Sequence, residues 1–552
     1  MTSRPEDKRK GGIAWSGSLV GSTNPANLGY RYSSVHKRYK RTGEANEEKD
    51  DLPSSVVIQF RNRQGQDVGT NVDVPMESAT DDMGALVHTL LNNEDDMDDE
   101  NDSKKIPYAF YALITAKDGT TQEIEITTSL QDFFTQHKEK EGVSTERVLE
   151  LIYQPLAVFR VRPVTRCTDT MPGHTEAVLH VSYSPDGRNL ASGGGDTTVR
   201  FWDVNTSLPR HTCMGHRNHV LCTSWSPDGT KFASADKNGV VIIWDPSTGK
   251  ATSTIKAHGK WITSMAWEPM HLSANGVCER LVTSSKDSHA KIWNVRSKTC
   301  LATLSSHADS IECVKWSGSG WIYTASRDRT VKVWAADTTD RNGLGKLIRT
   351  LVGHGHRVNA LALSDDYICR TGPFDHTCAK FASAQEAHEA AKKKYNDFVT
   401  TGGGNPERLV SGSDDFTLFV WHPREGKHPI TRLTGHQQAV NHIAFSPDGR
   451  YFASGSFDKK VKIWDGRNNG AFLKTLTGHV GAVYQVAWSS DGRFLVSASK
   501  DSTAKLWDVT SGKRARETLP GHADEVYALD WSPNGSSVAT GSKDRTIKIW
   551  KH

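Results

Sequence analysis

A string of about 43 residues recurs along most of this 552-residue chain and limits the folds open to it. In its clearest copy the string begins at Gly435-His436, passes through an apolar run at 443–445 and a Ser-Pro-Asp-Gly turn at 446–449, and ends at 461–465. Both halves alternate apolar and polar residues, as half-buried β-strands do, and Pro-Asp-Gly is typical of tight turns. The repeat therefore predicts many short antiparallel strands.

One tryptophan ends each copy, and successive tryptophans of this kind are 41 to 49 residues apart, except for one interval of 87 residues. These tryptophans are Trp202, Trp244, Trp293, Trp334, Trp421, Trp464, Trp507 and Trp550. A period of 40 to 45 residues with Gly-His and Trp-Asp signatures is the WD40 pattern, with four strands in each propeller blade. The long interval holds a single Gly-His, at His354, and so predicts one blade with a surface-helix insertion near 383–405. We expect an all-β, eight-bladed WD40 β-propeller over residues 158–552.

Three more positions recur in each copy, and two of them keep a fixed distance from its last tryptophan. A histidine begins the copy, a Ser or Thr lies ten residues before the tryptophan, and an Asp lies six before it. Because buried polar groups must be paired, these residues predict a hydrogen-bonded tetrad in each blade. A Ser/His/Asp trio that recurs eight times indicates architecture rather than a protease. The best matches are His174, Ser192, Asp196 and Trp202; His436, Ser454, Asp458 and Trp464; His479, Ser497, Asp501 and Trp507; and His522, Thr540, Asp544 and Trp550.

The second and the last copy of the repeat depart from the common pattern. Asn238 stands where the other copies have Asp, so we expect a neutral and weaker tetrad in the second blade. The last blade lacks an outer strand at the C-terminus, and we expect residues 158–164 to supply it and so close the ring.

The residues before the repeat divide into two parts. Residues 54–157 alternate strand-like and helix-like segments in the order ββαβ-β, which resembles a small α+β ubiquitin-like (β-grasp) domain. Residues 1–53 lack apolar periodicity and read as a disordered tail with basic clusters at 8–10 and 36–41 and an acidic run at 44–51. Such clusters occur in nuclear import signals, in phosphate contacts and in solvated tails.

Several classes of protein do not fit the sequence. The formal net charge of +4 is close to balanced, and no run of about 18 apolar residues is present, which argues against a membrane-spanning protein. We find no phosphate loop, no metal-ligand cluster and no isolated nucleophile–base pair. We therefore expect no enzyme, no cofactor of its own and no small-molecule substrate, and we assign the function to binding surfaces.

The residue before each turn Asp should be exposed on one face of the disc. Five of the eight are basic, at Lys237, Lys286, Arg327, Lys500 and Lys543. A ring of positive charge suits an acidic peptide or RNA phosphates, although such charges are often only solvated. Near the start of the first strands, Tyr484 and Tyr527 form a candidate protein-binding anchor, unless both pack within their blades.

The combination of these parts resembles the Notchless family of ribosome-assembly proteins. The strings that support the resemblance are 153–167, 195–203, 372–377 and 483–491. The resemblance implies a nuclear and nucleolar, non-enzymatic factor of the large (60S) ribosomal subunit, whose propeller binds the pre-60S particle. It also implies that the ubiquitin-like domain binds the metal-ion-dependent adhesion site of the AAA ATPase midasin and transmits its pull. In the segment Ser144, Thr145 and Glu146, the Glu146 carboxylate would complete the Mg²⁺ sphere held by that partner.

A second class of function stays open from the sequence. WD40 discs also serve as signalling adaptors and as substrate receptors of ubiquitin ligases. Such a protein would be expected to have an F-box-like docking segment, and we see none in the sequence.

Overall fold

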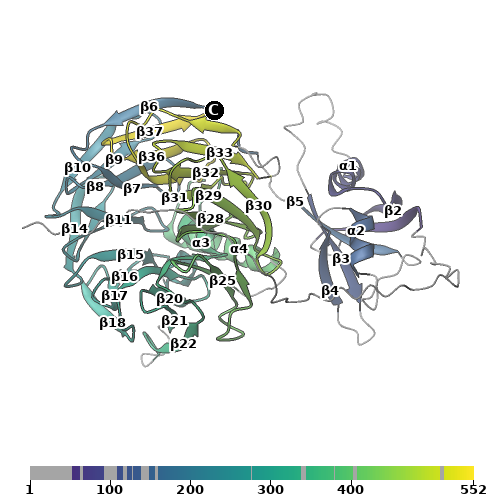
Figure 1. Cartoon of the computed structure of the whole chain (residues 1–552), viewed down its shortest axis with the longest axis horizontal. Coiled ribbons are helices and arrows are strands. Elements are labelled where there is room, and N and C mark those ends of the chain that lie inside the picture. The colour runs from purple at the N-terminus through teal and green to yellow at the C-terminus, as the bar shows by residue number, and fades with distance from the viewer. Residues whose placement is uncertain are drawn as a thin grey trace, which may run out of the picture. The chain divides into compact units, whose positions relative to one another are not determined.

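A computed structural model of the chain describes residues 53–62, 66–91, 108–115, 121–126, 129–137, 148–155, 160–274, 276–336, 343–377, 379–401, 407–509 and 515–552. Residues 1–52 of the predicted tail lie outside these ranges. Figure 1 shows a small α+β unit early in the chain and a larger set of sheets that follows it.

The small unit is a five-stranded sheet with two helices. Its elements are β1 (Ser55–Arg61), β2 (Asp67–Pro75), α1 (Thr80–Leu90), β3 (Tyr108–Thr115), β4 (Thr121–Ile126), α2 (Leu130–His137) and β5 (Leu149–Pro155). The strand order is β2-β1-β5-β3-β4, with β1 parallel to β5 and the other pairs antiparallel. Phe60 and Phe110 are fully buried in its core, and their rings lie 5.9 Å apart. The strands expected from the sequence at 56–60, 68–74, 108–114, 123–126 and 148–153 and the helices expected at 82–91 and 130–136 are all present, with ends that differ by a few residues.

Residues from 166 onward form eight four-stranded antiparallel sheets, which we number 1 to 8. Sheet 1 is β7 (Val178–Tyr183), β8 (Asn189–Gly194), β9 (Thr198–Asp203) and β10 (Pro209–Met214); sheet 2 is β11 (Val220–Trp225), β12 (Phe232–Asp236), β13 (Val240–Asp245) and β14 (Lys250–Lys256). Sheet 3 is β15 (Ile262–Trp267), β16 (Arg280–Ser285), β17 (His289–Asn294) and β18 (Thr299–Ser305); sheet 4 is β19 (Ile311–Trp316), β20 (Trp321–Ser326), β21 (Thr330–Ala335) and β22 (Leu347–Val352).

The remaining four sheets follow the same plan. Sheet 5 is β23 (Val358–Leu363), β24 (Leu409–Ser413), β25 (Leu418–Trp421) and β26 (Thr431–Leu433); sheet 6 is β27 (Val440–Phe445), β28 (Tyr451–Ser456), β29 (Lys460–Asp465) and β30 (Ala471–Thr477). Sheet 7 is β31 (Val483–Trp488), β32 (Phe494–Ser499), β33 (Ala504–Asp508) and β34 (Glu517–Leu519); sheet 8 is β35 (Val526–Trp531), β36 (Val538–Ser542), β37 (Thr546–Lys551) and β6 (Arg166–Pro172).

The first strands of the sheets form a closed ring. Each lies beside the first strand of the next sheet, and β35 of sheet 8 lies beside β7 of sheet 1. Second strands are buried along nearly their whole length, while outer strands such as β6 and β14 are mostly exposed. This gradient explains the sequence pattern, because a strand covered on both faces needs small and apolar residues and an outer strand does not. The arrangement is consistent with a β-propeller.

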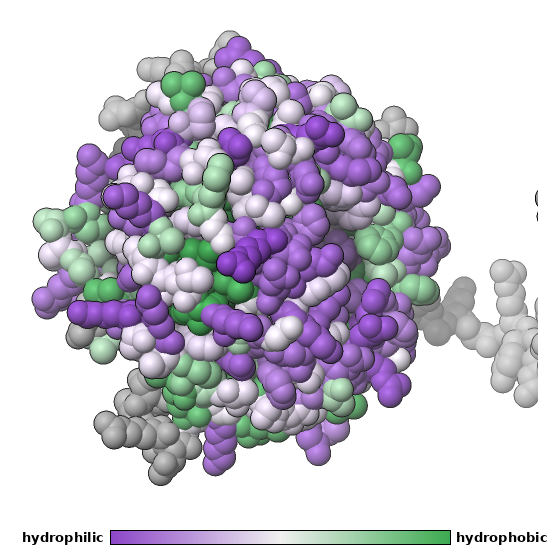
Figure 2. Space-filling view, turned by 90° about the vertical axis from the view of Figure 1, so that its left-hand side faces the viewer, coloured by the Kyte–Doolittle hydropathy of each residue, from purple (hydrophilic) through white to green (hydrophobic). Residues whose placement is uncertain are grey.

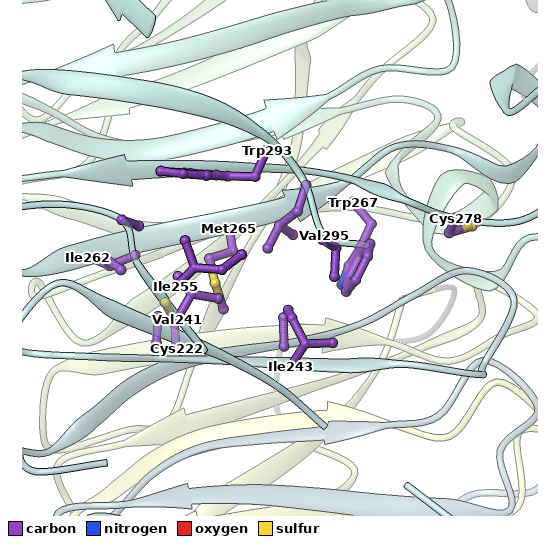
Figure 3. Packing of buried hydrophobic residues seen from close by; sticks show 14 of the residues in the cluster. Cys222, Val241, Ile243, Ile255, Ile262, Met265, Trp267, Cys278, Trp293 and Val295 are labelled. Carbon is purple, nitrogen blue, oxygen red and sulfur yellow. The ribbon is translucent and has the colours of Figure 1, made fainter. Parts of the chain in front are cut away.

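Apolar side chains fill the space between neighbouring sheets. Between sheets 2 and 3, Ile243 and Ile255 of one sheet pack with Met265, Trp267 and other residues of the next (Figure 3). Buried residues of this kind recur between the other pairs of sheets. Each sheet therefore buries its faces against its two neighbours, and the closed ring leaves no sheet without a partner.

The ring closes with a different strand from the one predicted. Residues 158–164 were expected to be the outer strand of sheet 8, but β6 (Arg166–Pro172) pairs with β37, with Thr546 opposite Pro172 and Lys551 opposite Arg166. The apolar residues that suggested the earlier segment lie inside instead: Val161 and Val164 are buried among residues of sheets 7 and 8. An outer strand is largely exposed and need not be apolar, so its residues gave a weaker signal.

The long interval between Trp334 and Trp421 contains two helices between β23 and β24. These are α3 (Asp366–Thr371) and α4 (Ala384–Thr401), the second of which lies within the predicted insertion. One face of α4 is buried rather than wholly exposed, because Ala387 and Ala391 join the apolar cluster of sheet 3 beside the short 3₁₀ helix η2 (Met270–Leu272). The ring of Tyr395 stacks on His271, with centroids 4.0 Å apart.

Helix α3, which the sequence did not predict, connects three sheets at the end of the first strands. The Arg370 guanidinium lies 2.8 Å from the Asp530 carboxylate of sheet 8, and Lys315 of sheet 4 lies 2.9 Å from Asp366. Asp530 also accepts a hydrogen bond of 2.8 Å from the backbone N–H of Tyr183 in sheet 1. The insertion therefore clamps distant sheets of the ring together at this face.

Candidate binding face of the ring

We call the top face the face at which the first strands begin and the second strands end. The turn between the second and third strand lies at this face, where its backbone is bonded to the residue before the first strand. In all eight sheets an N–H of the turn donates to that residue's C=O, in the pairs Gly195–Ala177, Lys237–His219, Lys286–Trp261, Arg327–Ser310, Asp414–Arg357, Phe457–Ala439, Lys500–Ala482 and Lys543–Glu525. The repeat thus places two variable positions of each sheet side by side.

Beneath this face, sheet 6 shows how the predicted tetrad is built. His436 Nδ1 lies 2.7 Å from Asp458 Oδ2, and His436 Nε2 lies 2.8 Å from Ser454 Oγ. The Trp464 indole N–H donates to the same Ser454 Oγ at 2.9 Å. The carboxylate next to Nδ1 assigns the proton to that nitrogen, so Nε2 accepts from the Ser454 hydroxyl. Every polar group of the set has a partner.

The tetrads also hold a charge. Burial disfavours the ionised form of Asp458, but the hydrogen bond and the electrostatic attraction from His436 outweigh burial and lower the pKa of this carboxyl. The same carboxylate accepts a 3.0 Å hydrogen bond from the backbone N–H of Gln437, which fixes the loop after the histidine to the turn. The tetrad therefore holds the top-face loops in place.

Three other tetrads named from the sequence have the same geometry. The His–Asp, His–Ser/Thr and Trp–Ser/Thr distances are 3.0, 2.8 and 3.0 Å for His174, Asp196, Ser192 and Trp202; 2.8, 2.7 and 2.8 Å for His479, Asp501, Ser497 and Trp507; and 2.8, 2.8 and 2.9 Å for His522, Asp544, Thr540 and Trp550.

Sheet 2 departs from the sequence prediction. Asn238 does not face the histidine; its side-chain oxygen accepts a 3.0 Å hydrogen bond from Asn218 at the surface. His216 Nδ1 instead lies 3.2 Å from Asp236 Oδ2, two residues earlier, and His216 Nε2 lies 2.6 Å from Ser234 Oγ. Asp236 also accepts hydrogen bonds of 2.9 Å from the backbone N–H groups of Asn238 and Val240. The expected neutral set is therefore wrong, because the turn moves a carboxylate into the same place from another position.

The five predicted basic residues all lie on the top face, but they differ in their surroundings. Lys500 Nζ lies 3.9 Å from Glu525, Lys543 Nζ lies 3.3 Å from Asp524, and Arg327 Nε lies 3.8 Å from Asp309. No ion pair joins Lys237 or Lys286 to a carboxylate in the part of the chain that the structure describes. The positive ring is thus partly neutralised, and its free charge lies on sheets 2 and 3.

Tyr484 and Tyr527 lie together on sheets 7 and 8, with ring centroids 5.5 Å apart. Phe457 of sheet 6 meets Tyr484 edge-on at 6.2 Å, so three neighbouring sheets present an aromatic row. The Tyr484 hydroxyl donates a hydrogen bond to Glu525 at 2.8 Å. Burial, and to a smaller extent this hydrogen bond, raises the pKa of Tyr484. Both tyrosines are half-buried and Phe457 is exposed. Phe457 was not among the predicted anchor residues, because it occupies a different position in the repeat from the two tyrosines.

The other predicted sites are placed as follows. Ser144, Thr145 and Glu146 lie outside the described residues. Over the described residues, no group of three or more His, Cys, Asp or Glu side chains has the arrangement of a metal site. None of the helices placed in this structure combines the length and apolar character that crossing a bilayer requires. On the side seen in Figure 2, hydrophilic residues cover most of the surface and hydrophobic ones lie in small groups.

Comparison with known proteins gives two family matches. A family described as "WD domain, G-beta repeat" matches residues 165–203, 207–245, 249–294, 298–335, 427–465, 470–508 and 513–551. A family described as "NLE (NUC135) domain" matches residues 56–134, in the small α+β unit. The interval with α3 and α4 lies between matched repeats.

Whole-chain relatives cover most of the sequence. Protein Notchless of Drosophila melanogaster is 44% identical over 412 residues, which cover 73% of this chain and 77% of that protein. The Notchless protein homolog of Arabidopsis thaliana is 47% identical and covers 73% and 78%. Ribosome assembly protein 4 of Saccharomyces cerevisiae is 44% identical and covers 73% and 76%. A crystal structure of the computationally designed Ika8 protein matches with a TM-score of 0.53 at 24% identity, covering 69% of this chain and 98% of that one, and supports the fold alone.

Proposed function

The chain belongs to the Notchless family of WD-repeat proteins, and from that premise we propose that it is a non-enzymatic assembly factor of the large (60S) ribosomal subunit. The observation that supports this most is the 44% identity to Ribosome assembly protein 4 of yeast over 73% of the chain. A protein of this kind works in the nucleus and nucleolus, where ribosome precursors are built.

The proposal includes the finer architecture. The eight sheets are the blades of one WD40 propeller over residues 158–552, and residues 54–157 form a ubiquitin-like domain. The closed ring of first strands and the sheet order β2-β1-β5-β3-β4 support these assignments. The propeller binds the pre-60S particle through its top face, where the aromatic row of exposed Phe457 and half-buried Tyr484 and Tyr527 offers flat rings suited to a protein partner.

The small domain has a separate role in this proposal. It binds the metal-ion-dependent adhesion site of midasin, and its Glu146 carboxylate completes the partner's Mg²⁺ sphere. Mg²⁺ prefers hard oxygen ligands in octahedral geometry, so one carboxylate offered by a second protein fits an open position. The pull of the ATPase then passes through the chain to the propeller, remodels the precursor and releases factors.

Purification tests the assembly role. A tagged chain should recover large-subunit precursor rRNA, and Tyr484→Glu should weaken sedimentation with the precursor because a charge replaces a packed ring. Leu301→Glu is the matched control, since Leu301 is exposed on the outer strand β18. Recovery of ubiquitin-ligase subunits without precursor rRNA would contradict the proposal.

Binding to the isolated adhesion-site domain tests the role of Glu146. Glu146→Ala and Glu146→Asp should both abolish Mg²⁺-dependent binding while leaving thermal unfolding of the chain unchanged, because the shorter carboxylate does not reach the same coordination position. Unchanged binding by both variants would remove Glu146 from the mechanism.

A further inference from the structure

The indole of Trp261 is the one exposed tryptophan side chain among the residues that the structure describes, with 39% of its surface accessible. It lies on the top face, immediately before the first strand of sheet 3, where the other sheets have Ala, His, Ser, Arg or Glu. The eight tetrad tryptophans are buried, as are those that end the first strands. Exposure of a large apolar ring at a loop position is therefore not part of the repeat's architecture.

Two lysine ammonium groups lie over this ring. Lys237 Nζ from sheet 2 and Lys286 Nζ from sheet 3 are each 4.3 Å from its centroid. Both belong to the turn positions next to the first strands, and the Lys286 N–H donates to the Trp261 C=O at 3.0 Å. The backbone of the turn and strand therefore fixes how the lysines and the indole are placed.

The charges on these lysines are not balanced locally. Lys500, Lys543 and Arg327 lie within 4 Å of carboxylates, but over the described ranges neither Lys237 nor Lys286 has an ion-pair partner. Lys260, next to Trp261 in the chain, is also exposed. Two cations that share one ring repel each other, and the ring offers each only a modest attraction. An anionic ligand would relieve that repulsion.

The ligand that fits must bring negative charge and a flat surface together. A peptide of Asp and Glu supplies carboxylates for the lysines but no aromatic ring for the indole. Single-stranded RNA supplies both, because a base stacks on an aromatic side chain while the adjoining phosphates meet basic groups. We propose that Trp261, with Lys237 and Lys286 beside it, is a stacking site for one base of single-stranded RNA.

In this site each lysine moves from the ring to a phosphate when a base occupies the indole. Stacking on the indole should tolerate any RNA sequence, since every base has a π-face. The identity of the RNA in the cell, a ribosomal precursor, rests on the proposed function, whereas the binding itself is a property of this surface.

Fluorescence anisotropy of the full chain with a fluorescein-labelled 12-nucleotide oligoadenylate tests the site. Trp261→Ala should weaken binding about tenfold, the loss expected for one stacked base, while Trp261→Phe should stay within about threefold of the unsubstituted chain. Lys237→Ala combined with Lys286→Ala should reduce the slope of log K against log salt by about 1.4, for two phosphate contacts. Lys256→Ala, an exposed lysine on the outer strand β14, should change neither quantity.

Two further probes separate stacking from charge alone. An abasic ribose-phosphate 12-mer should bind the unsubstituted chain and Trp261→Ala equally, and a 12-residue polyglutamate peptide should not distinguish the two proteins. Equal oligoadenylate affinity for the unsubstituted chain and Trp261→Ala, with thermal unfolding unchanged, would overturn the proposal. Tenfold discrimination by the polyglutamate peptide would overturn it in favour of an acidic protein partner.

The outcome is distinct from that of the assembly test. A chain that binds oligoadenylate through Trp261 but never recovers precursor rRNA would contradict the proposed function and leave this site standing. If the unsubstituted chain and Trp261→Ala sediment with the precursor equally well and bind oligoadenylate equally, the stacking site is contradicted and the proposed function stands.

Discussion

Replacing Asp236 by Ala should destabilise the ring far more than replacing Asn238, although only Asn238 occupies the register of the repeat. Asp236 is 1% exposed and accepts from His216 and from the backbone N–H groups of Asn238 and Val240. Removing the carboxylate leaves three donors without their partner. The Asn238 side chain is exposed and bonds only to Asn218 in the described structure.

The expected magnitudes follow from these contacts. A buried donor left without a partner costs about 1–3 kcal/mol, and water reaches some of the three, so Asp236→Ala should cost about 2–5 kcal/mol. Asn238→Ala should stay within about 0.5 kcal/mol, as surface substitutions usually do. Asp236→Asn should fall between them, because it keeps one acceptor oxygen and loses the charge that attracts His216.

Urea unfolding followed by circular dichroism measures the effect. Since a chain of 552 residues need not unfold in one step, the midpoint is compared among variants rather than converted to a free energy. Hydrogen exchange of the β12 and β13 amides reports whether the loss is local to sheet 2. Equal midpoints for Asp236→Ala and Asn238→Ala, or a lower one for Asn238→Ala, would show that the tetrad of sheet 2 does not depend on Asp236.

Three further outcomes test other parts of the ring. The pKa of Asp287 is lowered to about 2: burial opposes the shift, and it is outweighed by the hydrogen bond and electrostatic attraction from His258 together with the interactions with His289. The ionised Asp287 carboxylate should contribute fully to stability above its unfolded-state pKa of about 3.9, and this contribution should be lost as pH falls toward 2. The difference in urea midpoint between the unsubstituted chain and Asp287→Ala should therefore shrink from pH 5 to pH 2.5. A difference that stays constant over this range would contradict the prediction. Arg370→Ala should cost about 3–5 kcal/mol because it leaves Asp530 buried without its cation. Arg370→Met with Asp530→Asn should recover part of the loss, because the amide removes the unpaired charge and its oxygen still accepts from the Tyr183 N–H; equal instability of the single and double variants would refute the clamp. Ala391→Lys should release α4 from sheet 3 and expose it to limited proteolysis, while Lys392→Ala on its exposed side should not.

The repeat made much of the ring predictable from sequence. A recurring His, followed by a Ser or Thr ten residues before a Trp, locates three strands of each sheet, because a buried polar group at the wrong register would lose its partner. The resemblance to the Notchless family, drawn from strings such as 483–491, is confirmed by relatives at 44–47% identity. The alternating apolar pattern also located the strands of the small unit to within a few residues.

Four features of the structure were not predicted from the sequence, and each has a physical reason. The outer strand β6 is mostly exposed, so its residues lack the alternation that would mark a strand, while Val161 and Val164 have apolar character for packing inside. Asp236 was missed because hydrogen bonding depends on where the turn places an oxygen and not on the count of residues. Helix α3 is short, and its position is decided by ion pairs to residues more than 50 positions away, such as Arg370 with Asp530. Trp261 has no place in the repeat, and only its exposure and the two lysines distinguish it.

The top face therefore presents two surfaces that differ in kind. On sheets 6 to 8, the aromatic row lies next to Glu525 and Asp524, which neutralise Lys500 and Lys543, so apolar contact dominates there. On sheets 2 and 3, positive charge is unbalanced and surrounds a single indole. A ligand that suits one surface is poorly suited to the other. A phosphate backbone gains little from the neutralised lysines of sheets 6 to 8. A hydrophobic anchor gains little from the indole of Trp261, because ammonium groups cover it. Two unlike ligands bound at separate places on the ring would restrict its orientation more than either contact alone.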